Sequence, residues 1–261
     1  MKFPQSFPIT RTWPPQHPER IQLYSINSPN GVKASVMLEE TGLPYEPHLV
    51  RFDLKQQLSA EFRSLNPYAK IPAIIDPLGP GGSPLALFES GAILIYLADK
   101  SGKFLAASGA ARYETLQWLM FTSANISPIF GQVGFFHKFS GKEYEDKRPR
   151  DRYVAESRRL LDLIEERLAT REWIMGNEFT VADIGTFPMI RPMYVIFRTQ
   201  LRHCDTLIPV YSPSSSAAAN LERNYGRKCC AKLAVDSHTT NAKFWISSDS
   251  SLVTIRSTEA I

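Results

Sequence analysis

A proline at the entry to a short apolar strand constrains the fold of this chain more than any other feature. Residues 66–76 read Asn-Pro-Tyr-Ala-Lys-Ile-Pro-Ala-Ile-Ile-Asp. Because proline has no backbone N–H to donate, it marks a strand start or a special turn. The Ile71–Pro72 bond is also of the type that readily becomes cis. A cis bond would leave the N–H and C=O of Ile71 unpaired, able to hold an extended peptide as an added strand.

A second segment places an acid and a hydroxyl where a helix begins. Residues 88–97 read Phe-Glu-Ser-Gly-Ala-Ile-Leu-Ile-Tyr-Leu. Glu89 and Ser90 offer a carboxylate, a hydroxyl and the free backbone N–H groups of a helix start. Those groups suit an amino acid that carries both an ammonium and a carboxylate. Two plainer explanations stay open: Pro72 only shapes the fold, and Glu89–Ser90 only begins a helix.

The spacing of apolar residues predicts a thioredoxin-like domain over residues 20–101, with the order β-α-β-α-β-β-α and a mixed four-stranded sheet. A strand, helix and strand this close in sequence form a right-handed unit with parallel strands. A loop rich in glycine and proline predicts a hairpin between the last two strands. Strands are expected at 21–25, 45–52, 72–76 and 84–88, and helices at 30–41 and 89–100.

Residues 111–201 are predicted to form an all-α domain after a small-residue linker. Its clearest helix is amphipathic and covers 151–169. Thr180 and Asp183 resemble a capping box at the start of a helix that Pro188 and Pro192 should interrupt or bend. An earlier helix, containing Tyr113, is expected to end near residues 127–128, and 134–149 are expected to form mainly a loop.

The two ends of the chain differ from the middle. Residues 1–19 are rich in proline and are expected to form an extended arm across the surface or a partner subunit. From residue 202 to 261 no helical period is sustained. This tail is expected to be disordered or to arise from a shifted reading frame, with a lineage-specific folded tail as the alternative.

Composition excludes several classes of function. The 261 residues carry a formal charge of +4 that is dispersed, so we expect no nucleic-acid partner. No run approaches the roughly 20 apolar residues of a membrane span, and no secretory signal is evident, so we expect no membrane association. All three cysteines lie in the last sixty residues, which favours a cytoplasmic protein. No histidine pair has metal-ligand spacing, so no metal is expected.

Together, the segments at 66–76 and 88–97 resemble the glutathione-binding half of the cytosolic glutathione S-transferases. Residues 173–184 resemble the capping motif of that family's second domain. Residues 28–31, Ser-Pro-Asn-Gly, resemble the Nu-class and Ure2-like subgroup, in which this turn replaces a catalytic Tyr, Ser or Cys. The resemblance extends from about residue 21 to about residue 198.

The resemblance implies a site for glutathione as co-substrate. Asn30 and Ser28 would donate hydrogen bonds to its thiolate at the first helix, where the dipole also favours a negative charge. The tripeptide itself would be held by Gln57, Lys70, Ile71, Pro72, Glu89, Ser90 and Arg152. From the residues alone, Ser28–Gly31 is better explained as a helix cap, and an exposed lysine such as Lys70 is usually only solvated. For Arg152, a solvated surface position is an equal alternative.

The same resemblance implies a dimeric enzyme in which the thiolate attacks an electrophile. The subgroup favours reduction of small disulfides with two glutathiones and no protein cysteine. A peroxide or an organic electrophile could replace the disulfide. Two further hypotheses are a non-catalytic glutathione-binding or regulatory protein and a defective, truncated family member.

Overall fold

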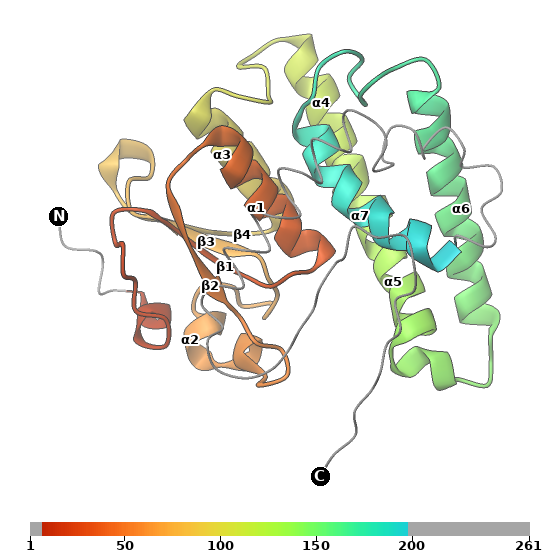
Figure 1. Ribbon diagram of the computed structural model, residues 1–261, viewed down its shortest axis with the longest axis horizontal. Helices are drawn as coiled ribbons and strands as arrows, with labels where there is room; N and C mark the ends of the chain where they lie inside the picture. Colours follow the sequence, from red (N-terminus) through yellow and green to blue (C-terminus); the bar gives the residue numbers. More distant parts are fainter. Residues whose placement is uncertain (1–6, 198–261) are drawn as a thin grey trace, which may run out of the picture.

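A mixed four-stranded sheet forms the first half of the computed structural model, which describes residues 7–197. The strands lie in the order β2-β1-β3-β4. β1 pairs with β2 in parallel, whereas β3 is antiparallel to both β1 and β4. This confirms the predicted thioredoxin-like topology (Figure 1). The strands are β1 (Ile21–Ser25), β2 (Tyr45–Leu49), β3 (Ala73–Asp76) and β4 (Leu85–Phe88).

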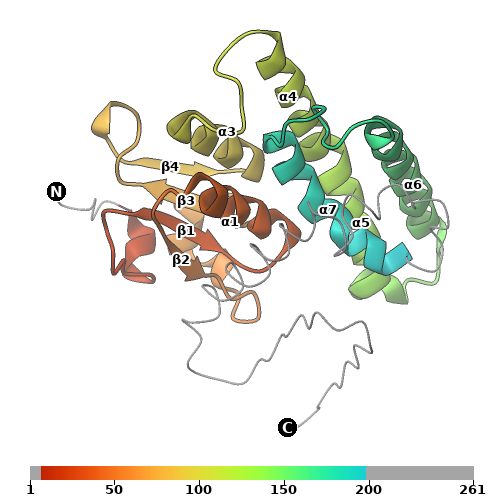
Figure 2. The same cartoon turned by 45° about the horizontal axis from the view of Figure 1, so that its top comes forward.

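Both faces of the sheet are covered, and alternate strand residues face opposite layers. Leu23 and Ile74 pack with α1 (Pro29–Thr41) and α3 (Ser90–Ser101) on one face. Tyr24 and Ile75 pack on the other face with Phe62 of α2 (Ala60–Arg63). Because side chains alternate along a strand, the register of strand pairing decides which residues face α1 and α3 and which face α2. Figure 1 and Figure 2 show α1 and α3 side by side along the sheet. Two short 3₁₀ segments, η2 (Gln56–Leu58) and η3 (Pro80–Gly82), lie in the connections.

The N-terminal arm packs onto the edge strand β2. It contains a short 3₁₀ helix, η1 (Pro8–Arg11), so it is not extended throughout, and its Ile9 is fully buried. The indole Nε1 of Trp13 donates to the carbonyl oxygen of Leu49 at 3.1 Å. The backbone N–H of His17 donates to the Glu46 carboxylate at 2.7 Å. The arm therefore covers β2, an edge strand that would otherwise offer unpaired backbone groups.

The second half is helical, but its helices run further than the sequence predicts. α4 and α5 form one continuous rod through a π-helical turn, η4, so residues 127–128 do not end a helix. α7 likewise continues through Pro188 and Pro192. Residues 134–138, expected in a loop, belong to α5. The elements are α4 (Ala110–Phe121), η4 (Thr122–Ile126), α5 (Ser127–Lys138), η5 (Ser140–Glu143), α6 (Arg148–Leu168) and α7 (Val181–Phe197).

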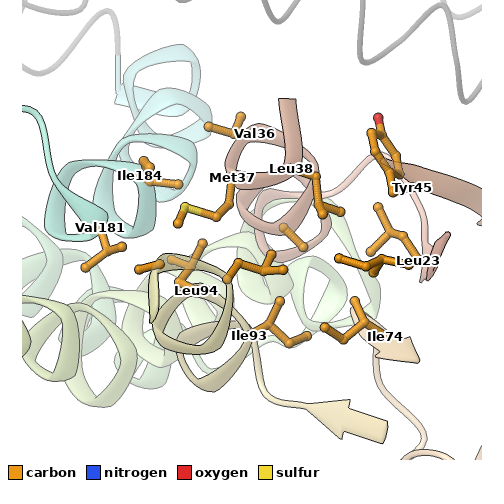
Figure 3. Packing of buried hydrophobic residues seen from close by; sticks show 14 of the residues in the cluster. Leu23, Val36, Met37, Leu38, Tyr45, Ile74, Ile93, Leu94, Val181 and Ile184 are labelled. Carbon is orange, nitrogen blue, oxygen red and sulfur yellow. The ribbon is translucent and has the colours of Figure 1, made fainter. Parts of the chain in front are cut away.

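One apolar cluster joins the sheet layer to the helical layer. Met37 and Leu94, from α1 and α3, pack in the same cluster as Val181 and Ile184 of α7 and Leu119 of α4. Figure 3 shows these α1, α3 and α7 side chains facing one another, and Figure 1 shows α1 beside α7. The division into units at 20–101 and 111–201 stays a prediction, as does the tail at 202–261, which lies outside the described residues.

The start of α7 is fixed by Asp183. Its buried carboxylate accepts from the backbone N–H groups of Ile174 and Thr180, at 2.8 and 2.9 Å, and from the Thr180 hydroxyl at 3.1 Å. The bond to Thr180 has the reach-back geometry of a capping box. Within residues 7–197, no helix combines the length and the apolar character that a membrane span requires.

Candidate functional site

Three turns meet at one edge of the sheet. Ala73 of β3 lies opposite Tyr24 of β1 on one side and Phe88 of β4 on the other. Because β3 runs antiparallel to β1 and β4, Ser25 after Tyr24, Pro72 before Ala73 and Glu89 after Phe88 lie at the same edge. Neighbouring strands are roughly 4.8 Å apart, so the three turns at this edge lie close to one another. The turns joined to these strand ends carry the predicted site residues: Ser28 and Asn30, Ile71 and Pro72, and Glu89 and Ser90.

The first turn places a helix N-terminus at this edge. Ser28 is the N-cap of α1, and its hydroxyl oxygen accepts from the N–H of Gly31 at 3.3 Å. Asn30 follows in the first turn of α1, half-buried, and its side chain makes no hydrogen bond within the described part of the chain. A Cβ on Gly31 would lie 2.1 Å from the carbonyl oxygen of Ile26. Glycine is therefore required for this tight approach of strand and helix.

The second turn presents an open backbone. The Ile71–Pro72 bond is cis. Among residues 7–197, neither the N–H nor the C=O of Ile71 makes a backbone hydrogen bond. Asn66, only 2% exposed, braces the turn. Its Nδ2 donates to the Lys70 carbonyl at 2.6 Å, and its Oδ1 accepts from the Tyr68 N–H at 3.0 Å.

Lys70, in the same turn, projects from the surface. Its Nζ lies 4.1 Å from the centroid of the Tyr68 ring, a cation–π arrangement. This contact holds the ammonium near the turn without burying it. Lys70 is therefore exposed beside Ile71, and its contact with an anionic group stays a prediction.

The third turn carries an unusual backbone. Glu89 has φ of 71° and ψ of 115°, outside the region that side chains with a Cβ prefer. Such a conformation costs roughly 1–3 kcal/mol and clusters at functional sites. The Glu89 side chain is exposed and makes no capping hydrogen bond. Ser90 opens α3 and is half-buried. A carboxylate and a helix N-terminus therefore stand side by side at the edge.

Two predicted residues stand apart from these turns. Gln57 lies in η2, and its Oε1 is buried without a hydrogen-bond partner in the described residues. Arg152 is exposed on α6, which packs against α5 and η4 rather than against the sheet. Arg152 helps to lower the pKa of the Glu156 carboxyl, behind the larger effect of the Arg159 hydrogen bond. The described contacts do not bring Arg152 to the sheet edge.

Lys33 is a charged residue of this region that sequence reasoning missed. It lies on α1, is 2% exposed, and donates from Nζ to the Ser127 hydroxyl of α5 at 3.0 Å. Burial lowers the pKa of Lys33 to about 8, while the negative charge of Glu89 acts in the opposite direction. The only signal in the sequence was a lysine among the apolar residues of a buried helix. No cluster of His, Cys, Asp and Glu suited to a metal occurs in residues 7–197.

Comparison with known proteins identifies the family. The sequence-family model of the glutathione S-transferase N-terminal domain matches residues 19–99, and the family model of the C-terminal domain matches residues 149–213. The chain belongs to the glutathione S-transferase family. Both halves of the predicted resemblance are therefore confirmed. The predicted Nu-class and Ure2-like subgroup is confirmed by the relatives, among them URE2 of Candida glabrata, which is 31% identical over 219 residues, 69% of this chain and 60% of URE2.

Two curated relatives from Escherichia coli are disulfide-bond oxidoreductases. YghU is 37% identical over 179 residues, which are 66% of this chain and 60% of YghU. YfcG is 39% identical over 173 residues, which are 65% of this chain and 79% of YfcG. The chain therefore spans about three fifths of the first relative and four fifths of the second.

A solved structure aligns over most of the chain. It is a glutathione transferase from Burkholderia graminis with two glutathione molecules bound per subunit. It is 54% identical, has a TM-score of 0.78, and covers 92% of this chain and 98% of the other. The fold and the family of this glutathione S-transferase therefore agree with those of a glutathione-bound relative.

Proposed function

We propose that this protein is a glutathione-dependent enzyme that reduces small disulfides. The observation that carries the proposal is the meeting of three turns at one sheet edge: the start of α1, the open backbone of Ile71, and Glu89–Ser90. An extended glutathione would pair its backbone with Ile71 and place its α-amino and α-carboxylate groups at Glu89 and Ser90. Its thiol would then lie toward the N-terminus of α1, whose dipole favours the thiolate.

The other proposed contacts follow the same pose. Pro72 shapes the turn that exposes Ile71, and Lys70 pairs with the glycine carboxylate. Gln57 has an unsatisfied buried oxygen that a ligand N–H would complete. The Ser28 hydroxyl oxygen accepts the capping bond and keeps its proton to donate, and the Asn30 amide makes no hydrogen bond in the described chain, so both thiolate candidates have a donor to offer. Arg152 is the weakest of the proposed contacts, since the structure leaves it on the outer helix α6.

The proposed reaction needs no protein cysteine. The thiolate of one glutathione attacks a sulfur of the substrate disulfide, its S–S bond breaks, and the leaving thiolate takes up a proton. A second glutathione thiolate then attacks the mixed disulfide, giving glutathione disulfide and a second thiol. Binding of two glutathiones by the Burkholderia relative and the oxidoreductase activity named for YghU and YfcG support this scheme. Residues 7–197 contain no cysteine that could replace either glutathione.

Turnover of 2-hydroxyethyl disulfide with glutathione tests the proposal. Asn30→Ala should lower kcat/KM about 10- to 100-fold, because a hydrogen bond to a charged group contributes roughly 1.5–3 kcal/mol. Asn177→Ala, at an exposed loop position, is the matched control and should leave turnover unchanged. Retention on immobilised glutathione without turnover of disulfide, peroxide or chlorodinitrobenzene would instead identify a non-catalytic glutathione-binding protein.

The proposal includes a homodimer that acts in the cytoplasm. Tyr113 and Met120 of α4 are 72% and 46% exposed in the single chain, and Phe88 of β4 is 38% exposed. Large apolar side chains at the surface suit a subunit interface. Sedimentation equilibrium should give twice the chain mass, and Tyr113→Asp with Met120→Asp should give the monomer mass. A wild-type protein that sediments as a monomer would contradict the dimer.

A further inference from the structure

Lys33 is a buried cation for which the fold supplies one hydrogen-bond acceptor. Its ammonium has three donor protons, and the Ser127 hydroxyl is its one hydrogen-bond partner in the described residues. Burial of a charge without full pairing is unfavourable. Replacing such a charge by an apolar side chain of similar volume is often neutral or stabilising. Stability alone therefore does not account for a lysine at this position.

The position of Lys33 on α1 directs its charge to the proposed thiolate site. It lies three residues after Asn30, so the two side chains share one face of the helix. Helical Cα–Cβ bonds tilt toward the helix N-terminus, so the long lysine side chain extends back toward the first turn. The contact with Ser127 places Nζ between α1 and the start of α5. Glu89, at the third turn, is the charged group that acts on it.

The helical half is shaped to receive this side chain. Ser127 comes directly after the π-helical turn η4, and such turns are frequent at functional sites. A Cβ on Gly91, beside Ser90, would lie 3.1 Å from the Ser123 hydroxyl, so the start of α3 also lies close to this turn. Lys33 therefore stands where the start of α1, the start of α3 and the α4–α5 joint meet.

We propose that the buried ammonium of Lys33 stabilises the glutathione thiolate, acting together with the N-terminus of α1. The inference rests on the proposed function and extends it to a residue that touches neither Ile71 nor the Glu89–Ser90 turn in the described hydrogen bonds. With a pKa of about 8, Lys33 stays mostly protonated at pH 7. A thiolate within a few ångströms would also favour the ammonium, because each charge stabilises the other.

Titration of bound glutathione tests this inference. The thiolate absorbs near 240 nm, so its pKa can be measured on the complex as pH is varied. Lys33→Met keeps an unbranched side chain that is one heavy atom shorter and removes its charge. The pKa of the bound thiol should rise by about one unit or more, as expected when a nearby opposite charge is lost. At a pH below the pKa of the thiol bound to wild type, the thiolate fraction and kcat/KM should both fall about tenfold, while affinity for S-methylglutathione, which has no thiol, stays unchanged.

The matched control is Lys103→Met. Lys103 follows α3 and donates to the carbonyl of Thr41 at the C-terminal end of α1, so this variant removes an equal charge at the opposite end of that helix. It should leave the bound thiol pKa within a few tenths of a unit. Lys33→Arg restores the charge and should return the thiol pKa part of the way.

Three outcomes would separate the possibilities. An unchanged thiol pKa in Lys33→Met, with glutathione still bound, overturns the role of Lys33 and leaves the proposed function standing. Equal losses of glutathione and S-methylglutathione affinity show a role in shaping the site rather than in charge, and overturn it as well. A wild-type protein that binds no glutathione contradicts the proposed function itself.

Discussion

The carboxylate of Asp183 connects the 173–176 turn to the start of α7. Two of its three hydrogen bonds satisfy the backbone N–H groups of Ile174 and Thr180, which would otherwise be buried without partners, and the third accepts from the Thr180 hydroxyl. Asp183→Ala should lower the free energy of unfolding by about 2–4 kcal/mol, because it removes the cap and leaves donors unsatisfied. Asp162→Ala, at an exposed position on α6, is the control and should change it by less than about 0.5 kcal/mol. Urea unfolding measures both, and equal midpoints would contradict the assignment.

The free energy of unfolding should depend on pH because Lys33 is buried. Its pKa is about 8 in the folded chain and 10.5 in the unfolded reference, so the unfolded state binds the proton more tightly. Below pH 8 the folded state carries the full penalty of burial, and the penalty disappears as pH rises from 8 to 10.5. A shift of about 2.5 units corresponds to roughly 3 kcal/mol. Wild type should therefore gain about that much relative to Lys33→Met across this range, measured without glutathione. A constant difference between the two proteins would exclude this penalty.

At the scale of elements, the start of α1 depends on a glycine. Gly31→Ala would place a Cβ 2.1 Å from a backbone oxygen and 2.5 Å from the Ser25 hydroxyl. Because backbone cannot move as a side chain does, the first turn of α1 must shift. We expect a loss of about 1–3 kcal/mol in stability and a larger proportional loss of disulfide turnover.

Gly131→Ala is the control for this prediction. Gly131 lies within α5, where an added Cβ meets no atom within 4 Å. Alanine favours a helix by up to about 1 kcal/mol over glycine, so this variant should be slightly more stable and fully active. If Gly31→Ala behaved like Gly131→Ala, α1 would not be fixed by close contact with the end of β1.

Local pattern predicts the sheet well and the helical half less well, for a physical reason. The strand alternation and the Thr180–Asp183 cap depend on neighbours in sequence, and both are found. The prolines mislead because their effect depends on context. Pro128 lies directly after the π-helical turn η4, where the backbone hydrogen-bond pattern already changes, so its missing N–H does not end the helix. Pro188 lies inside α7 at a cost of roughly 3 kcal/mol, which burial of Val181, Ile184 and their neighbours outweighs.

In the candidate site too, residues set by the local sequence could be predicted, and a residue set by a distant contact could not. Ser28, Asn30, Ile71, Pro72, Glu89 and Ser90 could be found because they stand at turns next to strands. Lys33 could not be predicted, because its place in the site depends on its hydrogen bond to Ser127, almost a hundred residues away. Arg152 was chosen by resemblance alone, and no contact in the described chain supports it.

At the scale of the whole molecule, the core crosses from the sheet layer to the helical layer. Ile184 of α7 belongs to the cluster that contains Leu23 of β1 and Ile74 of β3, whereas Ile164 of α6 belongs to a cluster formed by helices α4 to α7 and the segment before α7. Both isoleucines are buried, so either Ile→Ala change should cost about 2–5 kcal/mol. The two changes should nevertheless affect different parts of the chain.

Amide hydrogen exchange distinguishes them. Ile184→Ala should reduce protection in β1 and β3 as well as in α4 and α7, because it weakens the cluster that these elements share. Ile164→Ala should reduce protection mainly in α5 and α6. If Ile184→Ala left the strands as protected as in wild type, the sheet layer would be stable without α7. The proposed glutathione site at the ends of β1, β3 and β4 would then belong to residues 20–101 alone, and the Lys33–Ser127 contact could break without disturbing it.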